Sequence, residues 1–136
     1  MRRKILIVDD NVDLLKLLRL SFKEEGYTVR TAVNGPEALG KVRAFCPDLI
    51  LLDLVLPELD GFAVCELLRK NPATASTPII MLTGLTSQLS RVAGMESGAD
   101  EYVTKPFNTR RLIDRVSARL RPTEPPAETR WCAAVS

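Results

Sequence analysis

The stretch Asp48-Leu49-Ile50-Leu51-Leu52-Asp53 decides the fold class of this chain. Four consecutive apolar residues without polar alternation are typical of a strand buried on both faces, as in the middle of a parallel sheet. Pro57 and Gly61 follow and indicate a loop. Asp53 is therefore expected at the carboxyl end of a central strand, where open α/β sheets bind their ligands. Because Asp is also a common turn residue, this interpretation needs support from the other strands.

The rest of the chain repeats the same unit of a strand followed by a helix. Strands are expected at 4–8, 27–33, 48–53, 78–83 and 101–104, and helices at about 12–25, 36–45, 61–71, 87–97 and from 108 or 109 onward. Five such repeats predict an α/β fold: a doubly wound, five-stranded parallel sheet with helices on both faces and right-handed crossovers.

Apolar residues at helical spacing predict which side of each helix is buried. Two stripes illustrate this expectation: Val12, Leu15, Leu18 and Phe22 in the first helix, and a thinner one of Leu89, Val92 and Met95 in the fourth. Residues 1–121 are expected to form the folded domain. Residues 122–136, with three prolines among small and polar residues, are expected to form a flexible tail.

Composition narrows the function classes. The chain has 136 residues, is 46% hydrophobic and carries a net charge of +2, too small for nucleic-acid binding to be the default expectation. No apolar run approaches the roughly 20 residues of a membrane span, and no secretory segment opens the chain. These features predict a cytoplasmic protein that binds neither membrane nor nucleic acid directly.

The chain contains no histidine. This absence excludes serine–histidine and cysteine–histidine catalysis and the usual zinc-protease motif. Chemistry must therefore depend on carboxylates, hydroxyl groups, a lysine or a metal ion.

Chemistry-bearing residues follow four of the five strands. Asp9 and Asp10 follow the first strand, Asp53 the third, Thr83 ends the fourth and Lys105 follows the fifth. In a parallel sheet these ends share one edge, so the side chains should converge. Clustered carboxylates favour a hard cation such as Mg²⁺, while a lysine and a hydroxyl suit phosphoryl oxygens. Asp53 is then available as a nucleophile that forms an acyl phosphate.

These residues stand in four motifs: I-L-I-V-D-D at 5–10, L-L-D-L-V-L-P-E-L-D-G at 51–61, M-L-T-G at 81–84 and G-A-D-E-Y-V-T-K-P-F at 98–107. With them, the chain resembles a receiver domain of two-component response regulators, over about residues 3–121. The resemblance implies a flavodoxin-like sheet with strand order 2-1-3-4-5, the order known for chemotaxis proteins of this family.

The resemblance also implies roles for individual residues. Asp53 resembles the phosphoacceptor, and Asp9, Asp10, Asp53 and the backbone carbonyl of Val55 resemble the Mg²⁺ site, Asp9 often acting through water. Lys105 resembles the lysine that contacts the phosphoryl group, with a cis bond to Pro106. Thr83 and Tyr102 resemble the switch pair, in which the hydroxyl moves toward the phosphoryl group and the ring turns inward.

The implied function is a phosphorylation-dependent signalling switch. A sensor histidine kinase or phosphotransfer protein would donate the phosphoryl group, and the fourth helix, fifth strand and fifth helix would form the readout face for a downstream protein. The domain would catalyse its own modification and its hydrolysis without being a turnover enzyme. A stand-alone receiver is expected, and it should be a monomer or weak dimer because Arg91 and Arg111 replace a base–acid pair that relatives use across a dimer interface.

Two positions depart from the family's polar residues. Val55 lies two residues after Asp53, and Leu85 two residues after Thr83. Neither side chain can position a hydrolytic water by hydrogen bonding. The sequence therefore predicts slow loss of the phosphoryl group.

Three other interpretations fit less well. A phosphatase of the haloacid-dehalogenase type would need D-x-D-x-T after the first strand, but Asp9-Asp10-Asn11-Val12-Asp13 lacks the threonine. Dinucleotide binding would need G-x-G-x-x-G there, which is absent. A binding module with a silent pocket is disfavoured by the complete set of site residues.

Overall fold

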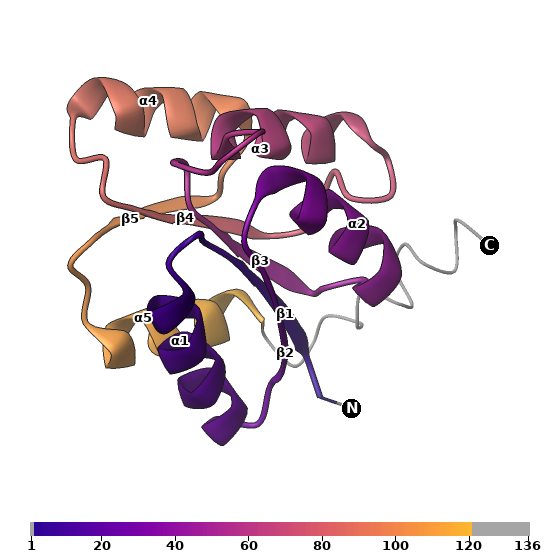
Figure 1. The fold of residues 1–136 in the computed structure, drawn as a ribbon, viewed down its shortest axis with the longest axis vertical. Helices are drawn as coiled ribbons and strands as arrows, with labels where there is room; N and C mark the ends of the chain where they lie inside the picture. Colours follow the sequence, from indigo (N-terminus) through magenta and orange to yellow (C-terminus); the bar gives the residue numbers. More distant parts are fainter. Residues whose placement is uncertain (1, 121–136) are drawn as a thin grey trace.

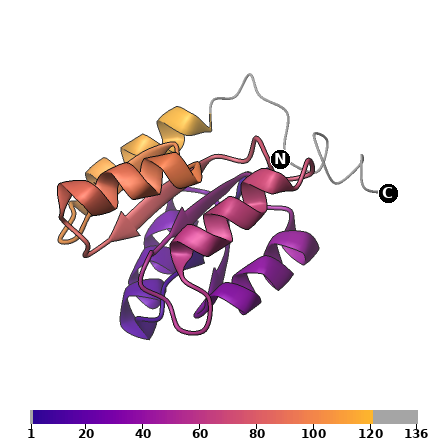
Figure 2. The same cartoon turned by 90° about the horizontal axis from the view of Figure 1, so that it is seen from above.

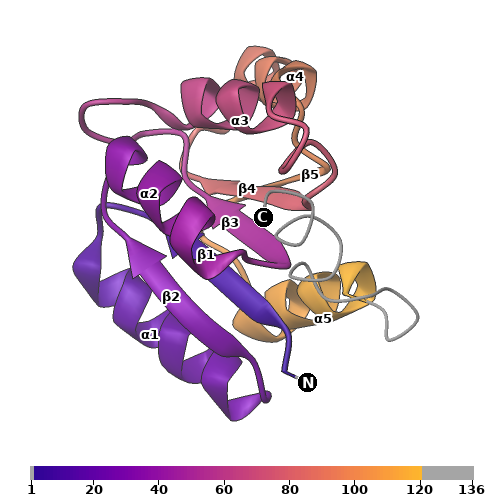
Figure 3. The same cartoon turned by 90° about the vertical axis from the view of Figure 1, so that its right-hand side faces the viewer.

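A single parallel sheet organises the domain. The structure is a computed structural model that describes residues 2–120, and its strands are β1 (Lys4–Val8), β2 (Thr28–Ala32), β3 (Leu49–Leu52), β4 (Ile79–Thr83) and β5 (Glu101–Thr104). All neighbouring strands pair in parallel, in the order β2-β1-β3-β4-β5 (Figure 3). This confirms the predicted fold class and strand order.

Five helices cover the sheet: α1 (Val12–Glu24), α2 (Gly35–Phe45), α3 (Gly61–Lys70), α4 (Gln88–Ser97) and α5 (Thr109–Arg119). Each begins after a capping side chain that accepts a backbone N–H of the first turn: Asn11, Asn34, Asp60, Ser87 and Asn108. Helices α1 and α5 lie on one face of the sheet (Figure 1), and α2, α3 and α4 lie side by side on the other (Figure 2).

Alternating strand side chains fill the two layers between sheet and helices. Ile5 and Ile7 of β1 pack with α1 and α5, while Leu6 and Val8 pack with the layer under α2, α3 and α4. The residues of β3 also alternate between the two layers, and all four of them are buried. The unbroken apolar run of β3 therefore reflects a strand that is covered on both faces, as predicted.

Strand register brings the site residues to one level. Val8 pairs with Leu52, and the backbone N–H of Asp53 donates to the Val8 carbonyl at 3.0 Å. The N–H of Asp9 in turn donates to Ala32 at the end of β2. The carboxyl ends of β1, β2 and β3 are thus aligned, so side chains that follow them meet at the same edge.

The two predicted helix stripes are partly wrong. Val12 is 51% exposed because it occupies the first turn of α1, beyond the sheet, whereas Leu15, Leu18 and Phe22 are buried as expected. The error is larger in α4, where the whole stripe is exposed and Leu89 reaches 81%.

Helix α4 packs instead through Gly94 and Ser97. A Cβ atom on Gly94 would lie 2.8 Å from the sulfur of Met81 and 3.0 Å from the ring of Tyr102. The absence of a side chain lets the helix approach the sheet closely, and this turns the apolar stripe toward solvent.

No helix within residues 2–120 is long and apolar enough to cross a membrane. The expected tail at 122–136 lies outside the described residues, as does the last residue of the expected domain.

Two glycines provide a test of this packing. Gly61 begins α3 where a Cβ would collide with the Asp53 carbonyl and lie 2.7 Å from the Leu54 Cα, whereas a Cβ on Gly40 in α2 meets nothing within 4 Å. We expect Gly61→Ala to lower the free energy of unfolding by about 1–3 kcal/mol through overpacking. Gly40→Ala should raise it by about 0.5–1 kcal/mol, because alanine favours helix. Urea unfolding measures both, and equal effects of the two substitutions would contradict the described approach of α3 to β3.

Candidate functional site

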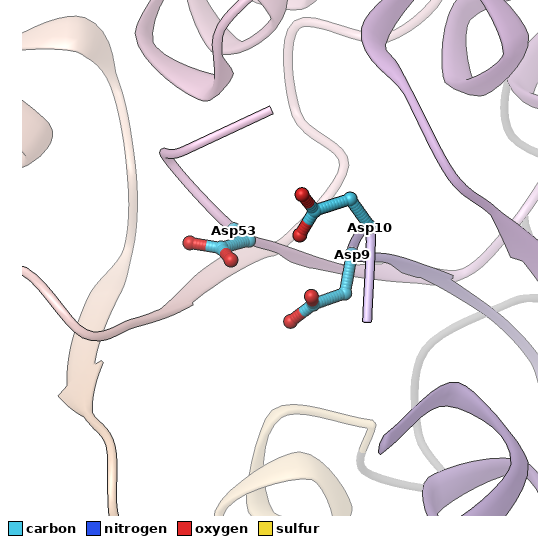
Figure 4. A group of neighbouring side chains, drawn as sticks. All are labelled: Asp9, Asp10 and Asp53. Carbon is cyan, nitrogen blue, oxygen red and sulfur yellow. The ribbon is translucent and has the colours of Figure 1, made fainter. Parts of the chain in front are cut away.

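Three carboxylates meet at the carboxyl edge of the sheet. Asp9 and Asp10 follow β1 and Asp53 follows β3, and one oxygen of each lies within 4.8 Å of the others (Figure 4). Asp9 and Asp53 are only 3% and 5% exposed, while Asp10 is open to solvent. The convergence predicted from the strand ends is therefore present.

Lys105 lies between the two buried carboxylates. Its Nζ is 2.6 Å from Oδ2 of Asp9 and 3.2 Å from Oδ2 of Asp53. Burial disfavours the ammonium charge, but the hydrogen bond to Asp9 and the nearby negative charges outweigh burial and raise the pKa of Lys105. The lysine is therefore charged and compensates part of the carboxylate charge. Its bond to Pro106 is cis, as expected.

Asp9 is buried in a position that disfavours its negative charge. Burial raises the pKa of the Asp9 carboxyl, and the charge of Asp53 adds to this effect. The hydrogen bonds from Lys105 and from the backbone N–H of Asn11, which donates to Oδ1 at 2.9 Å, oppose the shift without cancelling it. A further positive charge beside Asp9 would thus be favourable.

The donor set fits a hard divalent cation. Mg²⁺ prefers oxygen ligands, keeps several waters and commonly uses one or two carboxylates. Asp10 offers an exposed oxygen beside the buried oxygens of Asp9 and Asp53, so a cation here would keep contact with solvent. Val55 contributes a backbone N–H, which donates to Oδ1 of Asp53 at 3.2 Å. The expected role of its carbonyl as a ligand stays a prediction.

Thr83 and Tyr102 are linked through one loop residue. The Thr83 hydroxyl is fully buried and accepts the N–H of Leu85 at 3.3 Å. The Tyr102 hydroxyl donates to the carbonyl of the same Leu85 at 2.7 Å, and the ring is only 6% exposed. The loop between β4 and α4 therefore connects the two residues that the sequence paired as a switch, and the ring lies inward.

Arg91 was not expected to belong to this group. Its guanidinium carbon lies 4.8 Å from the centre of the Tyr102 ring, and Nη1 donates to the Tyr102 carbonyl at 3.2 Å. The two residues are on different elements, so no sequence spacing could have indicated the contact. Arg91 holds the ring against α4 from the solvent side.

A family model, that of the response regulator receiver domain, matches residues 5–117. The chain belongs to this family. It is a signalling domain of two-component systems, and the resemblance inferred from the four motifs is confirmed.

Relatives agree with this assignment. The chain is 46% identical, over 94% of its length and 55% of the relative's, to the DNA-binding response regulator MtrA of Mycolicibacterium smegmatis. Among solved structures, a putative response regulator from Chloroflexus aurantiacus is 38% identical with a TM-score of 0.83, covering 88% of this chain and 98% of that one. A two-component response regulator from Clostridium difficile is 32% identical with a TM-score of 0.84, covering 91% and 100%.

The expectation of no direct nucleic-acid binding was wrong. The MtrA proteins that match this chain are named DNA-binding response regulators, and the chain spans about half of their length. The expectation rested on the net charge of +2, a property of these 136 residues alone. The net charge of these residues says nothing about the part of the MtrA proteins that this chain does not match.

Mg²⁺ should stabilise the folded chain. A ligand at about 100 times its dissociation constant adds about 2.7 kcal/mol to the free energy of unfolding, provided it binds only the folded state. We expect Mg²⁺ to raise the thermal unfolding midpoint of the wild type, and Asp10→Asn to abolish most of this increase. Asp114→Asn, which changes an exposed acid on α5, is the matched control. An equal Mg²⁺ effect in all three proteins would contradict a cation site at the carboxylates.

Proposed function

We propose that this domain is a phosphorylation switch in which Asp53 accepts a phosphoryl group from a phosphohistidine on a sensor kinase or phosphotransfer protein. The observation that carries the proposal is the position of the Asp53 carboxylate. One oxygen accepts the Val55 N–H, the other contacts Lys105, and two further acids stand beside them. A cytoplasmic location, where a kinase would meet the domain, is part of the proposal.

The reaction needs few groups from the domain. An Asp53 oxygen attacks phosphorus, the bond from phosphorus to the donor's imidazole nitrogen breaks, and its electron pair remains on the imidazole. The product is an acyl phosphate. Mg²⁺, held by Asp10, Asp53 and the Val55 carbonyl with Asp9 alongside, would neutralise charge on the transferring group.

Lys105 has two roles in this proposal. Before transfer, its ammonium group contacts Asp9 and Asp53 and holds the Asp53 carboxylate in position. After transfer, it contacts a phosphoryl oxygen as a point charge while Asp9 still holds its other side. The Thr83 hydroxyl supplies a second donor to the phosphoryl group.

Movement of the Thr83 hydroxyl would connect the phosphorylation site with the face formed by α4, β5 and α5. Thr83 can turn toward a phosphoryl oxygen only if the contact with Leu85 adjusts, and Leu85 holds the hydroxyl of Tyr102. Phosphorylation adds about −1.5 to −2 charges and strong acceptors, so it favours the loop arrangement that satisfies them. The face formed by α4, β5 and α5 then reports the state of Asp53.

The similarity to MtrA supports a proposal about output. We propose that phosphorylation of this domain controls DNA binding by the protein of which it is part, as expected for a chain 46% identical to proteins named DNA-binding response regulators. The domain itself would catalyse only its own phosphorylation and dephosphorylation, and it would not turn over a separate substrate.

The proposal is tested with acetyl phosphate and Mg²⁺, followed by intact-mass spectrometry. Wild type should gain the mass of one phosphoryl group, and neither Asp53→Asn nor wild type without Mg²⁺ should gain it. Asp60→Asn, at the cap of α3 outside the acid cluster, is the control for general effects of removing a carboxylate. Modification of Asp53→Asn to the same extent as wild type would refute Asp53 as the acceptor.

The phosphorylated state should be long-lived. Val55 is 55% exposed beside the site and Leu85 follows Thr83, and neither offers a group that orients water for attack on phosphorus. Positioned proton acceptors typically contribute 10²–10⁴-fold to such steps. We therefore expect Val55→Asn to shorten the phosphorylated lifetime about tenfold or more, and Val55→Ile to leave it nearly unchanged. The lifetime is measured from the decay of the added mass. A wild-type lifetime of seconds would contradict this expectation.

A further inference from the structure

The loop of residues 54–60, between β3 and α3, supplies backbone groups to the carboxylate site. The Val55 N–H donates to Oδ1 of Asp53 at 3.2 Å, and the Val55 carbonyl is the Mg²⁺ ligand that the family resemblance implies. The Val55 side chain is 55% exposed and fills no space in the core. The position of this backbone therefore depends on how the rest of the loop is held.

The residues on either side of Val55 are anchored. Leu54 and Leu56 are both buried in the layer under α2, α3 and α4. The N–H of Gly61, at the start of α3, donates to the Leu54 carbonyl at 2.9 Å and brings the end of the loop back to its beginning. The loop is thus a closed turn, and a displacement at its far side reaches Val55 through a few backbone bonds.

The far side of the loop has a backbone conformation that residues other than glycine rarely adopt. Glu58 has a φ of +69°, in the left-handed region, and the Leu59 N–H donates to the Pro57 carbonyl across it at 2.8 Å. Three-residue turns of this kind with a positive φ are rare and strained. The Glu58 side chain is exposed, so its burial does not offset that cost. Such a conformation persists where the surrounding structure imposes it.

Gly35, the first residue of α2, provides this constraint from outside the loop. A Cβ atom on Gly35 would collide with the carbonyl oxygen of Leu59 and would lie 2.6 Å from its Cβ. Neither atom can rotate away, because a carbonyl oxygen and a Cβ move only with the backbone. The Leu59 side chain also packs against the core layer under α2. Any side chain at position 35 would therefore displace the loop itself.

Two other glycines show how specific this contact is. A Cβ on Gly40, in the same helix, would meet nothing within 4 Å. A Cβ on Gly61 would collide with the Asp53 carbonyl, so a substitution there disturbs the acid directly. The three atoms nearest to a Cβ on Gly35 all belong to Leu59. Position 35 thus reaches the loop without touching the acids.

We propose that Gly35 is a positioning residue for the Mg²⁺ site. The missing side chain lets the loop 54–60 close against the start of α2, and the closed loop holds the Val55 backbone beside Asp53. The inference deepens the proposed function and rests on it for the identity of the cation. Metal affinity typically falls 10–100-fold when the groups that hold ligands in place are changed.

Titration of the full 136-residue chain with MgCl₂, without a phosphoryl donor, tests this role. Amide NMR spectra at constant ionic strength give the dissociation constant and show in the same sample whether the chain is folded. We expect Gly35→Ala to weaken Mg²⁺ binding about tenfold or more, since the loop is displaced. Gly40→Ala, the same change where space is open, should stay within about twofold of wild type.

A second control separates positioning from a general loss of stability. Val42→Ala removes a buried side chain from the later part of α2, where Val42 is 4% exposed. It should lower the thermal unfolding midpoint and leave the Mg²⁺ dissociation constant of the folded chain within about twofold of wild type. A purely structural role of Gly35 would give the same pattern in Gly35→Ala. Unchanged Mg²⁺ affinity in folded Gly35→Ala, or an equal loss in Val42→Ala, would overturn the proposal.

A pair of substitutions at Glu58 tests the loop even if Gly35→Ala does not fold. Glu58→Gly should bind Mg²⁺ within about twofold of wild type, because glycine adopts a positive φ without strain. Glu58→Pro should weaken binding about tenfold or more, because proline fixes φ near −65°. The side chain is exposed in both cases, so the two variants differ in backbone conformation. Equal affinities of these two variants would show that the closed loop does not position the site.

Failure of the proposed function is distinguishable from failure of this inference. If wild type binds Mg²⁺ and Gly35→Ala binds it weakly, but wild type gains no phosphoryl mass from acetyl phosphate, the positioning role stands and the phosphorylation switch is refuted. If wild type is phosphorylated and Gly35→Ala binds Mg²⁺ equally well, only the role of Gly35 is refuted. Absence of any Mg²⁺ binding by wild type would overturn the inference together with the cation site.

Discussion

The contact of Lys105 with Asp9 and Asp53 is the interaction on which the functional edge of the sheet depends. The strand register places two buried carboxylates side by side, and two like charges in such a position would repel strongly without a cation. Lys105 extends from the end of β5 past β4 to reach both of them. The backbone N–H of the same residue donates to the Thr83 carbonyl at 2.8 Å, so Lys105 connects the two acids with the ends of β4 and β5.

This arrangement explains how a local charge can be read at a distant surface. Tyr102 lies on β5, three residues before Lys105, and its hydroxyl reaches the loop that follows Thr83. Gly94 leaves room for the Tyr102 ring, and the Arg91 guanidinium packs over that ring. In the proposed switch, charge added at Asp53 would change what Lys105 and Thr83 contact, and the adjustment would reach Tyr102 through Leu85 and then Arg91. Such a switch would need no large movement to alter the face formed by α4, β5 and α5.

The sequence predicted the sheet and the meeting of the polar side chains at its edge, because both depend on order along the chain. Consecutive apolar residues identified the buried strands, and polar residues directly after them had to share one edge. The burial of α4 was not predictable in this way, because Gly94 and not the apolar stripe sets how this helix packs. The contact between Arg91 and Tyr102 depends on that same packing and was missed for the same reason. The error about nucleic acid had another origin, since net charge describes only the residues that are counted.

The most direct measurement of the central claim is a crystal structure of the chain with Mg²⁺ and beryllofluoride, which forms a stable mimic of a phosphoryl group on a carboxylate. The account predicts the mimic on an Asp53 oxygen, with Lys105 Nζ and the Thr83 hydroxyl in contact with its fluorines. Mg²⁺ should lie between Asp10 and Asp53. The account would be contradicted if the mimic were bound elsewhere. It would also be contradicted if Lys105 kept its contact with Asp53 and made none with the mimic.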